Sequence, residues 1–353
     1  MKHKKFLKRL LYFALMLIII NVILDQLYKN FVVHNILNNA KDKDFMAYDD
    51  TLKYLSLGNS HNTVNTHILD NAYNYNAPAE NYVQSYYKLK SIIKEKKKKP
   101  EYLLLYIDMS AFSQLAAGYF EHNSYWIKYI DYFELSRIMH DKRILSKWLE
   151  GKFVSYAGGY RDIMLSIVYL VKIGKLDLHN GFRPPRNFKN FAYKKPADIS
   201  LFSDEADYDW TKGERIGKEE KIIRAKAKSG IYFNKKTYFD KTMATYFKMI
   251  LQLCQENDIK VILLRAPLTK AYWEDVNTII PVDSLYAKVE SIYRQYPNVT
   301  NVLDYHNIFF DHPEYFFDAD HINPKGTEIF TKRLKKDLKK EDKKNKTTQT
   351  SER

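Results

Sequence analysis

Two short stretches of the sequence carry residue types that together could make a hydroxyl group reactive. The first is an apolar run that ends in Gly58, a polar residue and Ser60, and a strand that ends in this way presents a nucleophile at the mouth of an α/β sheet. The second places Asp318 three positions before His321, just ahead of a Pro-Lys-Gly helix start. A serine hydroxyl needs a histidine base, and a carboxylate fixes the tautomer of that base. We therefore predict Ser60 as nucleophile, His321 as base and Asp318 as its orienting residue.

Two neighbouring side chains compete for these roles. His61 directly follows the nucleophile, but adjacent residues seldom present their side chains to each other, so we rank it second to His321 as the base. For the same reason we expect Asp320 to point away from His321. The ten histidines are otherwise scattered without convincing metal-ligand spacing. We therefore predict neither a metal site nor another cofactor.

Composition and charge limit the classes of protein to consider. The chain has 353 residues, 45% of them hydrophobic, which is enough for one large domain or two ordinary ones. The formal charge of +15 comes largely from three lysine-rich stretches, and no nucleic-acid motif accompanies them. A membrane surface or an anionic polymer is the expected electrostatic partner, and nucleic acid is not. Cys254 is the only cysteine, which excludes an intrachain disulfide, and its apolar surroundings predict a buried structural thiol.

The amino-terminal segment has the pattern of a membrane anchor. A cluster of basic residues precedes residues 10–24, which are apolar apart from Asn21, and no small-residue cleavage site follows. We predict an uncleaved single-pass anchor at residues 1–30, with the amino terminus in the cytoplasm and the rest of the chain outside it. A cleaved signal peptide and a buried core helix are the alternatives. Residues 31–51 are predicted to form a polar stalk.

From residue 52 onward, strand and helix patterns alternate. This alternation predicts an α/β domain at residues 52–338, with a mainly parallel sheet and helices on both faces in a flavodoxin-like three-layer arrangement. Residues 112–236 lose the rhythm and are expected to be a largely helical insertion over the carboxyl ends of the strands, and residues 339–353 a disordered basic tail. The expected strands are residues 54–57, 72–76, 102–107, 260–264 and 299–303; the expected helices are 62–69, 80–96, 238–257, 282–296 and 324–338.

The motifs at residues 58–61 (Gly-Asn-Ser-His) and 318–326 (Asp-Ala-Asp-His-Ile-Asn-Pro-Lys-Gly) resemble those of the SGNH (GDSL-type) hydrolase superfamily. The resemblance covers residues 52–108 and 238–338, and it is closer to the membrane-anchored branch that takes part in acyl transfer to cell-surface polymers. It implies the same roles for Ser60, Asp318 and His321 that their chemistry suggests. It also implies a multi-span membrane O-acyltransferase as partner and a glycan as substrate.

The resemblance also implies three donors to a developing oxyanion. The first two are the backbone amides of Ser60 and of Ala79, which stands where the family has glycine. The third is an asparagine after the third strand, but this chain has Asp-Met-Ser at residues 108–110; Ser110 and Asn76 are the candidate replacements. Losing one such donor typically costs about 3 kcal/mol of transition-state stabilisation, which favours acyl transfer over general esterase activity. Arg265, at a strand end, is a candidate contact for an anionic substrate.

Two functions from different classes follow from these patterns. The first is a membrane-anchored serine O-acyl (acetyl) transferase or esterase that acts outside the cytoplasm on a cell-surface or exported glycan. The alternative is a non-catalytic scaffold or glycan-binding member of a polysaccharide acylation or export complex, which the missing third motif and the aromatic-rich insertion favour. Aromatic residues in a helical insertion are more often core than sugar-stacking platforms.

Overall fold

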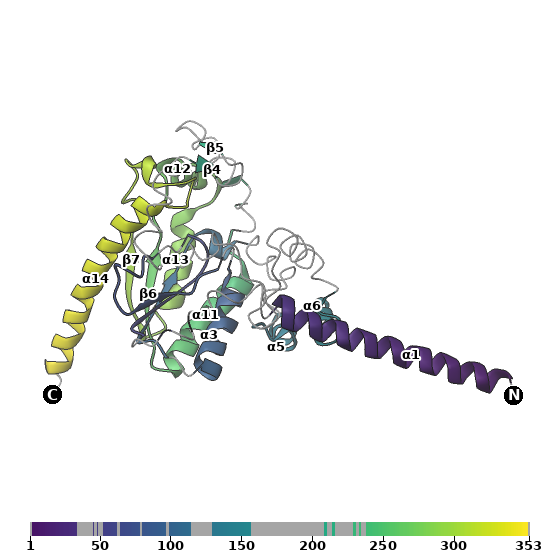
Figure 1. Ribbon diagram of the computed structural model, residues 1–353. Helices are drawn as coiled ribbons and strands as arrows, with labels where there is room; N and C mark the ends of the chain where they lie inside the picture. Colours follow the sequence, from purple (N-terminus) through teal and green to yellow (C-terminus); the bar gives the residue numbers. More distant parts are fainter. Residues whose placement is uncertain are drawn as a thin grey trace. The chain divides into compact units, whose positions relative to one another are not determined.

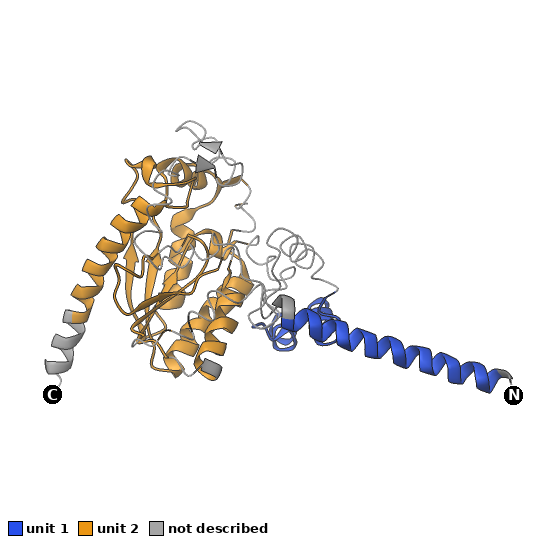
Figure 2. Cartoon of the chain, in the orientation of Figure 1, with its two compact units in different colours: residues 1–47, 119–189 blue, residues 48–118, 190–353 orange. Residues whose placement is uncertain are grey.

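The chain folds into two compact units, residues 1–47 with 119–189 and residues 48–118 with 190–353 (Figure 2). The computed structural model describes residues 2–33, 45, 48, 52–61, 64–77, 80–96, 99–113, 129–156, 208–209, 214–215, 229–230, 233 and 238–351. Most of the predicted stalk (residues 31–51) and of the insertion (112–236) therefore lies outside the described residues.

A five-stranded, all-parallel sheet forms the centre of the second unit, which confirms the predicted α/β class. The strand order is β2-β1-β3-β6-β7, so the chain leaves β1 in one direction toward β2 and crosses back to β3 on the other side. In open parallel sheets, functional sites form at such a reversal, outside the carboxyl ends of the strands. The strands are β1 (Tyr54–Leu57), β2 (Ala72–Asn74), β3 (Tyr102–Tyr106), β6 (Lys260–Arg265) and β7 (Val299–Asp304).

Helices cover both faces of this sheet (Figure 1). Helix α14 lies against one face, where Phe330 and Leu334 join a buried cluster with Tyr54, Leu104 and Ile262 of the strands. Successive strand residues face opposite sides. The alternate strand residues therefore face the layer of α3, α11 and α13, which Figure 1 shows on the other side. The helices are α3 (Tyr82–Lys96), α11 (Lys241–Glu256), α12 (Lys270–Ile279), α13 (Val282–Tyr293) and α14 (Pro324–Ser351).

Short elements complete this unit. They are the 3-10 helices η2 (Ser110–Phe112) and η6 (Pro313–Tyr315) and the two-stranded antiparallel ribbon of β4 (Tyr208–Asp209) and β5 (Glu214–Arg215). Cys254 is buried in α11, as predicted, and burial raises the pKa of its thiol.

The structure corrects the predicted helix at residues 62–69. Residues 62 and 63 lie outside the described residues, 64 and 65 have no regular structure, and 66–71 form turns with a bend at 69. The carboxamide of Asn65 accepts the backbone N–H of His67 at 2.9 Å, and the Asn65 carbonyl accepts those of Ile68 and Leu69. Asn71 then adopts a left-handed conformation with φ 53° and leads into β2. Asparagine satisfies turn backbone in this way and tolerates positive φ, which explains why the apolar spacing does not produce a helix here.

Two further differences concern helices. Helix α12 is absent from the prediction; Thr269 caps it by accepting the N–H of Tyr272 at 3.3 Å. Helix α14 continues to Ser351, through the tail predicted to be disordered at residues 339–353. Five of the 15 residues of the tail are lysine, which has high helix propensity, and extending an existing helix avoids the cost of nucleation.

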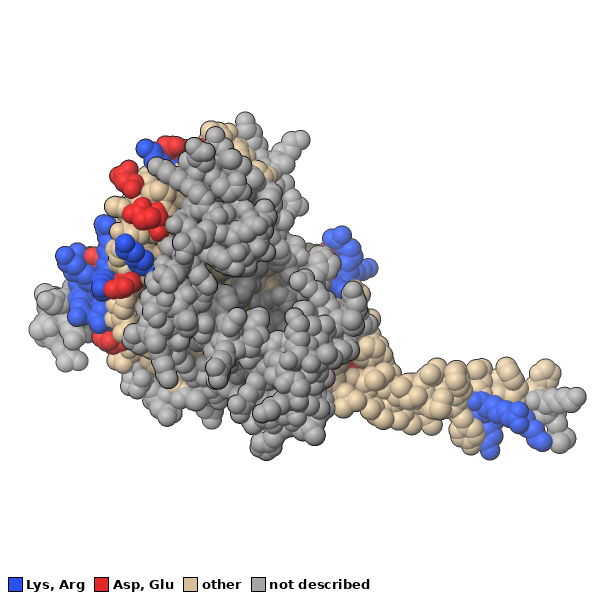
Figure 3. Space-filling model, turned by 45° about the horizontal axis from the view of Figure 1, so that its top comes forward, with Lys and Arg blue, Asp and Glu red and all other residues tan. Residues whose placement is uncertain are grey.

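The first unit contains α1 (Lys2–Leu27), the π-helical turn η1 (Tyr28–Val33), α5 (Tyr132–Met139) and α6 (Lys142–Phe153). Residues His3–Asn30 are long and apolar enough to cross a membrane, and most of their side chains are exposed. Figure 3 shows lysine and arginine side chains gathered near the free end of α1, beside a long stretch without charge. These features agree with the predicted span or signal anchor.

Candidate active site

The turn after β1 presents Ser60 at the edge of the sheet. Strand β1 is buried along its whole length, and it is followed by Gly58, whose φ of 143° is unfavourable for any residue with a Cβ atom. The carboxamide of Asn59 accepts the backbone N–H of His61 at 3.0 Å, which closes the turn. On the side of β2, the N–H of Ala77 donates to the Gly58 carbonyl at 3.2 Å. Gly58 and Asn59 together thus fix the position of Ser60.

A second turn, at residues 318–321, presents His321. The Asp318 carboxylate accepts the backbone N–H groups of Asp320 at 3.1 Å and His321 at 2.9 Å, so the acidic side chain itself shapes the turn. Thr269 fastens the turn to the start of α12 by donating from its backbone N–H and its hydroxyl to the Ala319 carbonyl, at 3.2 and 2.7 Å.

The residue that follows the turn caps the last helix. The side-chain oxygen of Asn323 accepts the N–H of Gly326 at 3.0 Å. Its backbone N–H donates to the Tyr315 carbonyl at 2.8 Å, and its side-chain NH₂ donates to the Glu314 carbonyl at 2.7 Å. Pro324 then starts α14, as predicted.

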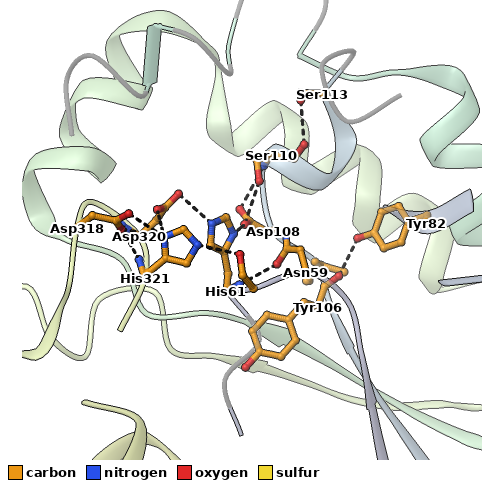
Figure 4. Close-up of polar contacts among 12 residues, drawn as sticks. Asn59, His61, Tyr82, Tyr106, Asp108, Ser110, Ser113, Asp318, Asp320 and His321 are labelled. Atoms are coloured by element: carbon orange, nitrogen blue, oxygen red, sulfur yellow. Dashed lines mark hydrogen bonds and ion pairs between the residues drawn. The ribbon is translucent and has the colours of Figure 1, made fainter. Parts of the chain in front are cut away.

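The two turns meet, although their residues are far apart in the sequence. Ser60 Oγ lies 2.8 Å from His321 Nε2. On the other side of the ring, His321 Nδ1 lies 2.9 Å from both oxygens of Asp318 (Figure 4). If Nδ1 carries the ring proton and donates a hydrogen bond to Asp318, then Nε2 is free to accept the hydroxyl proton of Ser60. This is the arrangement of a nucleophile, a base and the group that orients the base.

A second imidazole lies beside this group. His61 is bonded through Nδ1 to the carboxylate of Asp108, which follows β3, and its Nε2 lies 3.1 Å from Asp320 Oδ2. Asp320 also faces the other imidazole, with Oδ1 3.3 Å from His321 Nδ1 (Figure 4). The expectation that Asp320 points away from His321 is therefore wrong. Because the Asp318 carboxylate coils the turn, the neighbouring side chains at 320 and 321 come to the same side.

The charges of this cluster set the protonation of its members. Burial alone would lower the pKa of His61, but the carboxylates of Asp320 and Asp108 outweigh it and raise that pKa to about 10. In Asp108 burial opposes ionisation, yet the charge of His61 keeps the pKa below its usual value. Burial also acts to lower the pKa of His321. The negative charges of Asp318 and, to a smaller extent, Asp320 outweigh burial, so the pKa is raised above its usual value. His61 is thus an imidazolium at neutral pH, and the pKa of His321, like that of His61, lies above its usual value.

The cluster includes three residues with metal-ligating atoms. The ligand atoms of His61, Asp320 and His321 all lie within 4.8 Å of one another. Both nitrogens of His61 face carboxylates, however, and an imidazolium has no lone pair to offer a metal ion. The donor set therefore fits a network of protons and carboxylates better than a metal centre.

The remaining predicted site residues have mixed outcomes. Ser110 lies next to the cluster, but its hydroxyl donates to Asp108 Oδ2 at 3.0 Å and its N–H to Oδ1 at 3.2 Å, so it braces Asp108. Arg265 is paired with Asp304 at 2.5 Å and lies over the Tyr286 ring, 3.7 Å from its centroid. Asn76 is buried two residues after the end of β2, and Ala79 lies outside the described residues.

Sequence reasoning missed the roles of Asp108 and Asp320. Asp108 ends the third predicted strand, and a parallel sheet that places this strand beside the first brings its carboxylate to the residues after Ser60. The alternation Asp-Ala-Asp-His at residues 318–321 was a second available signal, because it offers two carboxylates to one histidine.

Comparison with known proteins adds no relative to this picture: no protein-family model matches the chain, and no curated protein matches it at a significant level. Fold and geometry define the class that can be stated, an α/β protein with a five-stranded parallel sheet. A serine, a histidine and an aspartate of this protein meet beyond the carboxyl edge of that sheet.

Proposed function

We propose that this protein is a membrane-anchored serine O-acyl transferase or esterase whose second unit acts outside the cytoplasm. The observation that carries the proposal is the chain of contacts from Ser60 Oγ through the His321 ring to Asp318, at 2.8 and 2.9 Å. The positive-inside pattern before the apolar segment of α1 supports a cytoplasmic amino terminus and a single span.

The geometry supports a two-step acyl transfer. His321 Nε2 takes the Ser60 proton as Oγ attacks the acyl carbonyl carbon, and the same proton is then given to the leaving group, which leaves an acyl-serine. In the second step His321 takes a proton from an acceptor hydroxyl, whose oxygen attacks the acyl carbon. The bond from the acyl carbon to Ser60 Oγ then breaks, and His321 returns the proton to Oγ. Water as acceptor makes the protein an esterase, and a sugar hydroxyl makes it a transferase. The resemblance to SGNH hydrolases favours a glycan acceptor and acyl delivery by a multi-span membrane O-acyltransferase.

The test is covalent labelling of the full-length protein with a fluorophosphonate, followed by peptide mass spectrometry. We expect stoichiometric labelling of Ser60 and loss of acetyl-ester hydrolysis, by three orders of magnitude or more, in Ser60→Ala. Ser291→Ala removes an exposed hydroxyl in α13 and should behave as wild type. Hydrolysis by Ser60→Ala at the wild-type rate would refute the proposal.

A second candidate is a non-catalytic scaffold or glycan-binding subunit, and one observation favours it. The Ser110 hydroxyl, a candidate third oxyanion donor, is engaged by Asp108. Loss of one oxyanion donor reduces transition-state stabilisation of hydrolysis by about 3 kcal/mol but does not affect ligand binding. Labelling separates the two functions, because a scaffold has no need of a reactive Ser60.

A further inference from the structure

Polar residues recur on one face near the end of the apolar helix α1. Asn21 and Asp25 of α1 and Lys29 of the following π-helical turn η1 are spaced by four, so they lie on the same side. Polar groups inside a membrane are costly unless they have hydrogen-bond partners within the protein. This face therefore requires a partner segment if α1 spans a bilayer.

The partner segment is the end of α6 and the residues that follow it. The Asn21 carboxamide donates to the Phe153 carbonyl at 2.6 Å and accepts the Tyr156 hydroxyl at 2.6 Å. Asp25 accepts both the backbone N–H and the hydroxyl of Ser155, at 2.7 and 2.5 Å.

Lys29 completes this contact. Its ammonium group donates to Asp25 at 2.6 Å and lies 3.4 Å from the Lys152 carbonyl. Asp25 and Ser155 are only 3% and 1% exposed, so the bonds between these two residues are closed to solvent.

These bonds fix the depth of α6 relative to the apolar helix. Asn21 lies nine residues before Asn30, the end of the candidate span, which corresponds to about 13 Å along the helix axis. The carbonyl of Phe153 is therefore level with the last apolar turns of α1. In a membrane-inserted protein, the end of α6 would sit at the boundary between acyl chains and headgroups.

The hairpin of α5 and α6 exposes apolar side chains at that level. Phe153 and Leu149 are 60% and 45% exposed and four residues apart on one face of α6, and Phe133 of α5 is 46% exposed. Trp148 lies against Phe133, with ring centroids 5.7 Å apart. Among the described residues, the only other exposed large hydrophobic side chain outside α1 is that of Ile329.

We propose that the α5–α6 hairpin, residues 131–156, is an interfacial membrane-binding element that inserts its apolar side chains into the outer leaflet beside α1. Exposed aromatic and aliphatic side chains together with flanking Lys142 and Arg143 are the composition that favours this boundary. The inference rests on the membrane anchoring proposed above, but not on the acyl-transfer chemistry. It gives the protein a second contact with the bilayer in addition to its span.

Site-directed spin labelling of the full-length protein tests this proposal. In a Cys254→Ala background, single cysteines that carry the spin label replace Phe153 and Leu149. Two further single cysteines serve as references: one at Leu17 in α1 for a lipid-embedded position, and one at the exposed Lys270 in α12 for an aqueous position. The labelled proteins are reconstituted into vesicles of phosphatidylethanolamine and phosphatidylglycerol. Collision with oxygen, which partitions into lipid, is compared with collision with a water-soluble nickel chelate.

We expect labels at residues 153 and 149 to collide several-fold more with oxygen than with nickel, as at residue 17, and the label at 270 to show the reverse. Nickel accessibility at 153 and 149 equal to that at 270, with residue 17 protected, would overturn the hairpin proposal alone. Nickel accessibility at residue 17 would overturn the anchor and the hairpin together. Protection from both reagents at 153 and 149 would indicate a protein partner, including a second copy, and would overturn the lipid assignment.

Discussion

The imidazole rings of His61 and His321 lie with their centroids 4.6 Å apart, and the carboxylate of Asp320 reaches both. Two adjacent histidines with the same ordinary pKa would repel each other when both are protonated. Here the buried carboxylates of Asp108 and Asp320 raise the pKa of His61 to about 10 and so hold a proton on that ring. His61 thus balances the buried negative charge, and His321 is the ring that contacts Ser60.

The first prediction separates the two carboxylates that face His321. Asp318→Asn should lower kcat/KM for ester hydrolysis by about 10³–10⁴-fold, because an amide in this position favours the wrong tautomer of the ring. Steady-state kinetics measures the loss, and Asp283→Asn, an exposed position in the first turn of α13, is the control. Near-normal activity of Asp318→Asn with an inactive Asp320→Asn would instead assign the orienting role to Asp320.

A second prediction concerns the pH dependence of acyl transfer. His321 accepts a proton only when it is neutral, and its carboxylate neighbours raise its pKa above 6.5. Activity should therefore rise with pH, with a midpoint on the alkaline side of 6.5. Asp320→Asn removes one of these charges, so the midpoint should move to lower pH in kcat/KM profiles. A midpoint that stays in place would show that Asp320 does not act on His321.

The third prediction concerns the stability of the buried charges. His61→Gln leaves Asp108 and Asp320 without their shared cation and should lower the free energy of unfolding by about 3–5 kcal/mol. Urea unfolding of the full chain in detergent, followed by tyrosine and tryptophan fluorescence, measures the change. His312→Gln, which removes an exposed ring from Glu314, should cost less than about 1 kcal/mol.

The same pair of variants gives this prediction a pH signature. The pKa of His61 is raised in the folded protein, so its contribution is fully present below about 6.5 and is lost as pH rises through about 10. Wild-type stability should therefore fall across that interval. His61→Gln should lack this part of the decline, and equal slopes for both proteins would contradict the proton assignment.

A fourth prediction concerns Gly326, where the start of helix α14 lies close to the backbone of η6. A Cβ atom on Gly326 would lie 2.5 Å from the Tyr315 carbonyl oxygen, which also accepts the N–H of Asn323. Gly326→Ala should therefore push the start of α14 away and destabilise the protein by about 1–3 kcal/mol.

Activity should fall as well in Gly326→Ala, since the same segment holds His321. Gly230→Ala is the matched control, because nothing lies within 4 Å of the added atom. Equal unfolding midpoints for both variants would show that the backbone at 326 yields without cost.

The parallel sheet was predictable because its strands are short, buried apolar runs separated by helical patterns. Residues 54–57 and 102–105 pair in register, as expected for neighbouring central strands. The meeting of Ser60 and His321 was predictable as well, because parallel strands with crossover helices bring their following loops to one edge. Residue types and sheet topology were therefore enough to predict the sheet and the proximity of Ser60 to His321.

The orientation of individual side chains was not predictable in the same way. Spacing arguments assume regular backbone, but Asp318 binds two backbone N–H groups in its turn and thereby directs Asp320 toward both histidines. The bond between His61 and Asp108 joins residues 47 positions apart and depends on the adjacency of β1 and β3. Likewise, the carboxamide of Asn65 outweighs the apolar periodicity that suggested a helix.

The serine and its base are separated by 261 positions in the polypeptide. During synthesis the ribosome adds His321 to the chain 261 residues after Ser60, so the pair can assemble only after that whole intervening segment has been made. A protein that enters a membrane by its first helix would thus remain chemically inert throughout translocation. Truncated products that lack the last helix and the turn before it would carry an intact Ser60 with nothing to activate it.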